Sequence, residues 1–191
     1  IDNYIIASGD GDFSILISAL KQIGKTVYGM STSKSSTNKK SLFAAISPKD
    51  SGIDFVNPIL AAHPKSYLYA SAMGCGGIAV GDLNNDGLPD LFFTGGPVGN
   101  KLYLQTEKLT FRDATKEAGV AGDHAWATGT AMIDIDNDGD LDIYVCNYDV
   151  ANNLYINNGN GSFTELAKAF KLDLVAAGHT PAFCDFNLDG H

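Results

Sequence analysis

Short apolar runs separated by polar, glycine-containing segments dominate the chain after residue 76. Such runs occupy residues 77–81, 91–94, 131–133 and 143–145. Apolar runs of this length, bounded by turn residues, predict β-strands rather than helices. The pattern therefore predicts a mainly β fold for the larger part of the chain.

The apolar runs recur with a fixed period. Residues 102–104 (Leu-Tyr-Leu) return as residues 154–156 (Leu-Tyr-Ile), and Phe111 returns as Phe163, so that both shifts equal 52 residues. One unit then consists of a strand, an acidic loop, a strand, a short strand, a turn and a last strand. Four short strands in a unit of about 50 residues are typical of a β-propeller blade. The sequence predicts an incomplete β-propeller with two blades and the start of a third.

An acidic loop with the pattern D-x-[DN]-x-D-G-x-x-D lies between the first two strands of each unit. Side-chain oxygens at positions 1, 3, 5 and 9, a backbone carbonyl at position 7 and Gly at position 6 are what a hard cation with several oxygen ligands requires. We expect Ca2+ at two sites, with a third loop that lacks its position 9. The predicted ligands are Asp82, Asn84, Asp86, Leu88 and Asp90 in the first loop, Asp134, Asp136, Asp138, Asp140 and Asp142 in the second, and Asp185, Asn187 and Asp189 in the third.

Two other interpretations of these loops, an EF-hand and a plain hairpin turn, fit the sequence less well. An EF-hand requires a bidentate Glu at position 12, but that position holds Phe93 in the first loop and Val145 in the second. A plain hairpin turn requires Gly and one neighbour, and it does not account for carboxylates at positions 1, 5 and 9 of both complete loops. The repeated carboxylates favour a metal site over a bare turn.

The first 40 residues have a different pattern. Residues 4–7 predict a buried strand, apolar residues at helical spacing over 13–23 predict a helix that ends at Gly24, and residues 26–29 predict a second strand. The polar, basic run at residues 31–40 predicts a linker. This part is therefore expected to be a short βαβ unit, with a domain boundary between residues 40 and 41.

Two carboxylates, Asp10 and Asp12, follow the first of these strands, where ligand groups usually lie in a parallel sheet. A pair of carboxylates there could hold Mg2+ for phosphodiester hydrolysis by a metal-activated water. The alternative is that Asp12 caps the helix and Asp10 serves the turn. The residues alone leave both interpretations open.

The repeats resemble the FG-GAP or VCBS-type calcium-binding propeller repeats, as in integrin-like propellers and the ASPIC/UnbV-associated proteins. The resemblance covers residues 42–191, within the expected domain 41–191, and depends on the motifs at residues 51–57, 76–82, 100–103 and 111–120. It implies a secreted or surface-exposed propeller in which Ca2+ stiffens the blade hairpins and loops are presented to a protein or carbohydrate ligand. Catalysis is not the usual role of such repeats.

Residues 1–40 resemble the carboxyl-terminal part of an NYN domain, a PIN-like ribonuclease family with an α/β fold, through residues 8–13 and 20–29. This resemblance implies a cytoplasmic, metal-dependent ribonuclease fragment that acts on RNA, with Asp10 and Asp12 as catalytic residues. The family's active site also draws on an acidic residue from an earlier strand, which has no counterpart here.

Charge and hydropathy limit these hypotheses. The formal net charge of -9 argues against a nucleic-acid surface, and ten of the acidic residues fall within the three loops. No run of 18 apolar residues occurs, so no membrane-spanning segment is predicted. A calcium-binding interaction or adhesion module is the first hypothesis, and a ribonuclease fragment is the alternative.

Overall fold

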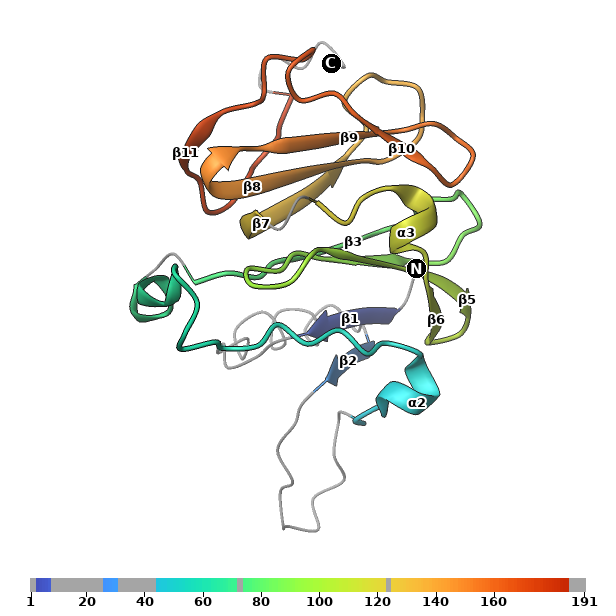
Figure 1. The fold of residues 1–191 in the computed structure, drawn as a ribbon. Coiled ribbons are helices and arrows are strands. Elements are labelled where there is room, and N and C mark those ends of the chain that lie inside the picture. The colour runs from blue at the N-terminus through green and yellow to red at the C-terminus, as the bar shows by residue number, and fades with distance from the viewer. Residues whose placement is uncertain (1–2, 8–25, 31–43, 72–73, 123–124, 186–191) are drawn as a thin grey trace. The chain divides into compact units, whose positions relative to one another are not determined.

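The computed structural model describes residues 3–7, 26–30, 44–71, 74–122 and 125–185, and it divides the chain into two compact units, residues 1–51 and 52–191 (Figure 1). Among the described residues no helix has the length and apolar character needed to cross a membrane. The domain boundary expected between residues 40 and 41 stays a prediction.

The first unit contains two paired strands, β1 (Asn3–Ala7) and β2 (Thr26–Met30), and a short helix, α2 (Pro48–Ser51). The strands are parallel, with Asn3 opposite Thr26 and Ala7 opposite Met30. Both strands predicted from the sequence are confirmed. Parallel pairing of consecutive strands requires a crossover connection, as a βαβ unit has. The helix predicted over residues 13–23 lies outside the described residues.

The second unit begins with a 3-10 helix, η1 (Ser66–Ala70), followed by a four-stranded sheet. The strands pair as an antiparallel meander in the order β3-β4-β5-β6, and a short helix, α3 (Thr115–Ala118), follows the last strand. The strands are β3 (Ile78–Gly81), β4 (Asp90–Phe93), β5 (Lys101–Glu107) and β6 (Thr110–Asp113).

A second antiparallel sheet repeats this meander and extends it. Strands β7 to β10 pair in sequence order, and β11 pairs with the far end of β8, where Val175 lies opposite Ala151. The strands are β7 (Trp126–Ile133), β8 (Asp142–Ala151), β9 (Asn153–Asn157), β10 (Phe163–Glu165) and β11 (Val175–Ala177). The predicted mainly β fold and four-stranded repeat are confirmed.

The two sheets pack face to face through one hydrophobic core (Figure 1). Alternate residues of β5, Leu102 and Leu104, and of β8, Ile143 and Val145, point to this core, because side chains alternate between the two faces of a strand. Burial of these side chains fixes the position of one repeat against the other. The core includes Phe92, Leu102 and Leu104 from the first sheet and Ile143, Val145 and Tyr155 from the second.

A second apolar cluster lies on the opposite face of the second sheet and contains Tyr144, Cys146, Leu154, Ile156 and Ala167.

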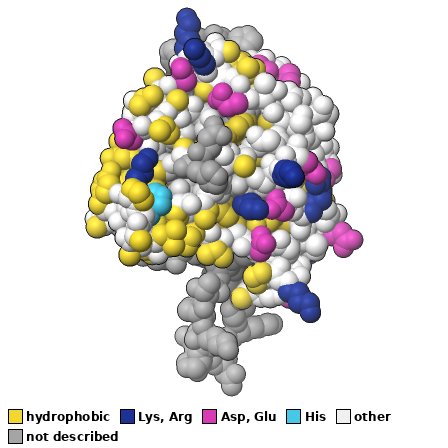
Figure 2. All heavy atoms as spheres, in the orientation of Figure 1, with side chains coloured by type: hydrophobic (Ala, Val, Ile, Leu, Met, Phe, Trp, Pro, Cys, Tyr) yellow, Lys and Arg dark blue, Asp and Glu magenta, His cyan; other side chains and the backbone are white. Residues whose placement is uncertain are grey.

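The surface of the second unit differs from side to side. Figure 2 shows charged side chains of both signs on the side that carries α3, β5 and β6, and hydrophobic side chains on the other.

Candidate metal centre

The two complete acidic loops join the first two strands of their sheets, β3 to β4 and β7 to β8. Each loop has left-handed backbone at positions 4 and 6: φ is 57° at Asn85 and 84° at Gly87, and 60° at Asn137 and 95° at Gly139. Asn tolerates this conformation better than most residues, and Gly adopts it without steric cost. The Asn-Asp-Gly sequence of both loops therefore permits the same tight winding.

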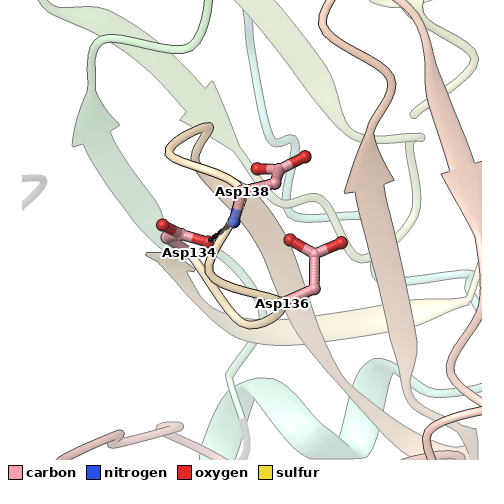
Figure 3. A group of neighbouring side chains, drawn as sticks. All are labelled: Asp134, Asp136 and Asp138. Carbon is pink, nitrogen blue, oxygen red and sulfur yellow. Dashed lines mark hydrogen bonds between the residues drawn. The ribbon is translucent and has the colours of Figure 1, made fainter. Parts of the chain in front are cut away.

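Three carboxylates of the second loop gather at one point. Oxygen atoms of Asp134, Asp136 and Asp138 all lie within 4.8 Å of one another, and Asp136 and Asp138 are exposed (Figure 3). Ca2+ binds oxygen at about 2.3–2.6 Å, so two oxygens that share one ion lie at most about 5 Å apart. The donor set and its spacing fit a calcium ion.

Backbone N–H groups hold these carboxylates in place. Asp134 accepts hydrogen bonds from the N–H of Asp138 at 3.1 Å and of Gly139 at 3.0 Å, and Asp138 accepts one from the N–H of Asp140 at 2.9 Å. Such contacts orient position 1 and position 5 before any ion arrives. The loop is thus preorganised by its own backbone.

The first loop has the same bonds 52 residues earlier. Asp82 accepts hydrogen bonds from the N–H of Asp86 at 3.1 Å and of Gly87 at 2.8 Å, and Asp86 accepts one from the N–H of Leu88 at 2.8 Å. Position 3 differs, since Asn84 replaces a carboxylate and its Nδ2 donates to Asp86 at 2.9 Å. Position 3 of the first loop therefore carries one negative charge fewer, and position 7, with Leu88 in place of Asp140, carries one fewer as well.

Position 9 of each loop is buried. Asp90 is 0% exposed, and its two oxygens accept the N–H of Leu83 at 2.9 Å and of Gln105 at 2.8 Å. Asp142 does the same, with the N–H of Ile135 at 3.0 Å and of Asn157 at 2.8 Å. These carboxylates join the loop to the third strand of the sheet. Each oxygen keeps a second lone pair, so their role as metal ligands stays a prediction.

The environment of position 9 disfavours the charged form. Burial, with a smaller contribution from the charges of Asp86 and Asp82, raises the pKa of Asp90 to about 6, although its two backbone hydrogen bonds act against this shift. Burial likewise raises the pKa of Asp142, with the charges of Asp136 and Asp138 acting in the same direction. A cation beside either carboxylate would favour its charged form.

Two contacts connect the loops of the two repeats. The side chain of Asp140 accepts a hydrogen bond from Asn85 Nδ2 at 2.5 Å, although we expected only its backbone carbonyl to act. Asn157, which is buried, donates from Nδ2 to the carbonyl of Leu83 at 2.8 Å and to that of Leu141 at 3.2 Å. No repeated pattern in the sequence singles out Asn157, so this link was not predicted.

The remaining predicted site residues are described only in part. Asp185 follows β11 within the described residues, whereas Asn187 and Asp189 of the third loop lie outside them. The candidate catalytic residues Asp10 and Asp12 lie outside them as well. Their assignments stay predictions.

A groove of about 1340 Å³ lies between the two repeats, at the ends of the strands opposite the acidic loops. It is lined by residues of the β4–β5 connection, by α3 and by the facing strands of the second sheet. Charged and aromatic side chains share its wall, among them Lys101, Lys116, Tyr155 and Glu165.

Comparison with known proteins gives matches in both parts of the chain. The FG-GAP-like repeat family matches residues 82–145 and 134–191, which together make up more than half of the chain, and the NYN domain family matches residues 1–47. Cartilage acidic protein 1 of Homo sapiens is 29% identical over 116 residues, which cover 59% of this chain and 17% of that protein. Both resemblances expected from the sequence are confirmed by the family matches.

The raised pKa of Asp90 predicts a pH dependence of stability in the absence of metal. Between about pH 4 and pH 6 the folded state holds a proton on Asp90 that the unfolded chain has released, so the free energy of unfolding should fall as the pH rises through this window. Urea denaturation in chelator between pH 4 and 7 measures the slope, which we expect to be shallower in Asp90→Asn. The exposed Asp173→Asn variant is the control, and an equal slope in wild type and Asp90→Asn would contradict the assignment.

Proposed function

Because this chain belongs to the family of FG-GAP-like repeat proteins, we propose that its two complete acidic loops bind Ca2+ and that the ions stiffen a module for interaction or adhesion. The observation that carries the proposal is the cluster of Asp134, Asp136 and Asp138. The matched hydrogen bonds in the first loop extend the same proposal to Asp82 and Asp86.

The proposed role of the ion is structural. Carboxylates held so close together repel one another, and the repulsion is relieved when a divalent cation binds among them. Lys101 and Arg112 are engaged elsewhere, in ion pairs with Asp113 and Glu117 on β6 and α3. Calcium would thus fix the hairpins β3–β4 and β7–β8, since binding to the folded state alone adds to its stability.

The calcium concentration that such sites require indicates where the module is located. Exposed loops of this kind suit calcium at the millimolar concentrations found outside cells. We therefore propose a secreted or cell-surface location for the repeats. The groove between the repeats is the proposed place for a protein or carbohydrate ligand, because it lies away from the acidic loops and combines charged with aromatic side chains.

Calcium titration by calorimetry on the whole chain tests the proposal. We expect about two sites, and a melting temperature that rises with the calcium concentration because the ion binds the folded state. The Asp86→Ala, Asp138→Ala double variant should lose both sites and the rise in melting temperature. Magnesium serves as the competitor. Absence of calcium binding by the wild-type chain, or binding that survives in the double variant, would refute the proposal.

The two sites should differ in affinity. The second loop offers a carboxylate at position 3, Asp136, where the first offers the amide of Asn84, and calcium affinity rises with the charge of the ligand set. We expect Asp136→Asn to weaken the second site and Asn84→Asp to strengthen the first, each by about tenfold, the equivalent of ~1.4 kcal/mol. The two substitutions exchange Asp and Asn in opposite directions, so opposite changes in affinity would exclude a general effect of substitution. Equal affinities in all three proteins would contradict the role of position 3.

A second candidate function concerns the first unit only. The NYN match at residues 1–47 and the parallel pairing of β1 and β2 favour a metal-dependent ribonuclease fragment in a cytoplasmic setting, with Mg2+ at Asp10 and Asp12. Cleavage of single-stranded RNA by the whole chain with Mg2+ tests it. Activity that is lost in Asp10→Asn, Asp12→Asn and retained in Asp86→Ala, Asp138→Ala would support this function, and no activity above a buffer blank would refute it.

A further inference from the structure

We infer that the two calcium loops are energetically coupled and that Asn157 is the positioning residue through which calcium in one loop raises the affinity of the other. The inference rests on the calcium binding proposed above. It extends that proposal from two independent sites to one linked pair.

A continuous series of hydrogen bonds joins position 9 of the first loop to position 9 of the second. Asp90 accepts the N–H of Leu83, the carbonyl of Leu83 accepts Asn157 Nδ2, and the N–H of Asn157 binds Asp142. The three bonds measure 2.9, 2.8 and 2.8 Å. Leu83 lies 74 residues before Asn157, so the series crosses from one repeat to the other.

Asn157 is held by its backbone N–H and by both polar atoms of its side chain. Besides these bonds, its Nδ2 donates to the carbonyl of Leu141 in the second loop at 3.2 Å, and its Oδ1 accepts the N–H of Gly159 at 3.1 Å. The residue is only 3% exposed. In a buried setting each of these bonds is costly to break, so movement of one loop disturbs the other.

The equivalent residue of the first repeat makes only part of this pattern. Gln105 donates its N–H to Asp90, as Asn157 does to Asp142, but its buried Oε1 has no hydrogen-bond partner among the described residues. Comparison of Gln105 with Asn157 shows that the backbone N–H and the side-chain amide at this position have different functions. The backbone N–H supports a loop within its own repeat, and the side-chain amide of Asn157 connects neighbouring repeats.

Two effects, the ordering of the loops and the charge of their carboxylates, decide whether calcium in one loop raises or lowers the affinity of the other. The loop tips are exposed, and segments with exposed hydrogen bonds open most readily. Calcium that orders one loop also restrains Leu83 and Asn157, so less ordering remains for the second ion. Repulsion between the ions is offset because the two loops carry eight carboxylates and a first Ca2+ neutralises two charges. These carboxylates are Asp82, Asp86, Asp90, Asp134, Asp136, Asp138, Asp140 and Asp142.

Calorimetric calcium titration at 0.15 M salt measures the coupling. Two single-loop variants, Asp82→Ala with Asp86→Ala and Asp136→Ala with Asp138→Ala, give the intrinsic association constant of each loop. The coupling factor is the product of the two stepwise constants of the intact chain divided by the product of the intrinsic ones. We expect a factor of at least about five. The factor should fall toward one in Asn157→Ala, where the Asn85–Asp140 hydrogen bond still joins the loops, and stay at the wild-type value in Asn152→Ala.

Asn152 is a matched control because it is also a buried Asn, and it bonds Asn147 and Tyr144 rather than either loop. A factor of one in the wild-type chain, or an unchanged factor in Asn157→Ala, would overturn the coupling while leaving calcium binding intact. No calcium binding by the intact chain or by either single-loop variant would instead refute the proposed function and the coupling with it.

A second readout leaves Asn157 in place. In the variant whose second loop is disabled, calcium bound to the first loop should slow hydrogen exchange at the amide of Asn157 by at least about fivefold, the lower end of typical coupling. A role of Asn157 in folding alone predicts no response to the ion. An exchange rate at Asn157 that calcium leaves unchanged, in a variant that still binds one ion, would overturn the inference.

Discussion

The buried carboxylate at position 9 of each acidic loop is the contact on which the rest of each repeat depends. Asp90 and Asp142 each accept one N–H from their own loop and one from the third strand of their sheet. The burial that makes these bonds strong also disfavours the charge that accepts them and raises the pKa of both carboxyls. A cation in the loop would relieve this conflict, which is why we connect the architecture of the repeat with metal binding.

Much of the second unit could be predicted because its strands and turns are determined by short stretches of sequence that occur twice. Apolar runs of three to five residues, glycine-containing turns and a 52-residue shift determine the strands, and the same shift relates the hydrogen bonds of the two loops. Gly87 and Gly139 illustrate the point, since the Gly expected at position 6 of both loops has the positive φ that Gly adopts without steric cost.

The links between the repeats could not be predicted in the same way. Asn157 reaches Leu83 only because the two sheets pack face to face through a common core, and no local pattern encodes that distance. The contact of Asn85 with Asp140 has the same origin. The sequence does contain one sign of the link between repeats, because Gln105 of the first repeat corresponds to a different residue, Asn157, in the second. The role of Asn157 can be recognised only when the fold is known.

The two parts of the chain differ in what supports a metal site. The repeats contain a described cluster of carboxylates, whereas the first unit has a family match and a parallel strand pair, with its candidate carboxylates outside the described residues. The calcium proposal therefore stands on geometry and family together, and the ribonuclease alternative on family and strand pairing.

The most direct test of the central claim is a crystal structure of the chain grown with calcium, with anomalous scattering used to locate the ions. We expect one calcium within about 2.3–2.6 Å of oxygens from Asp134, Asp136 and Asp138, and a second at Asp82 and Asp86. Loops free of anomalous density at saturating calcium, or ions bound only elsewhere on the surface, would contradict it.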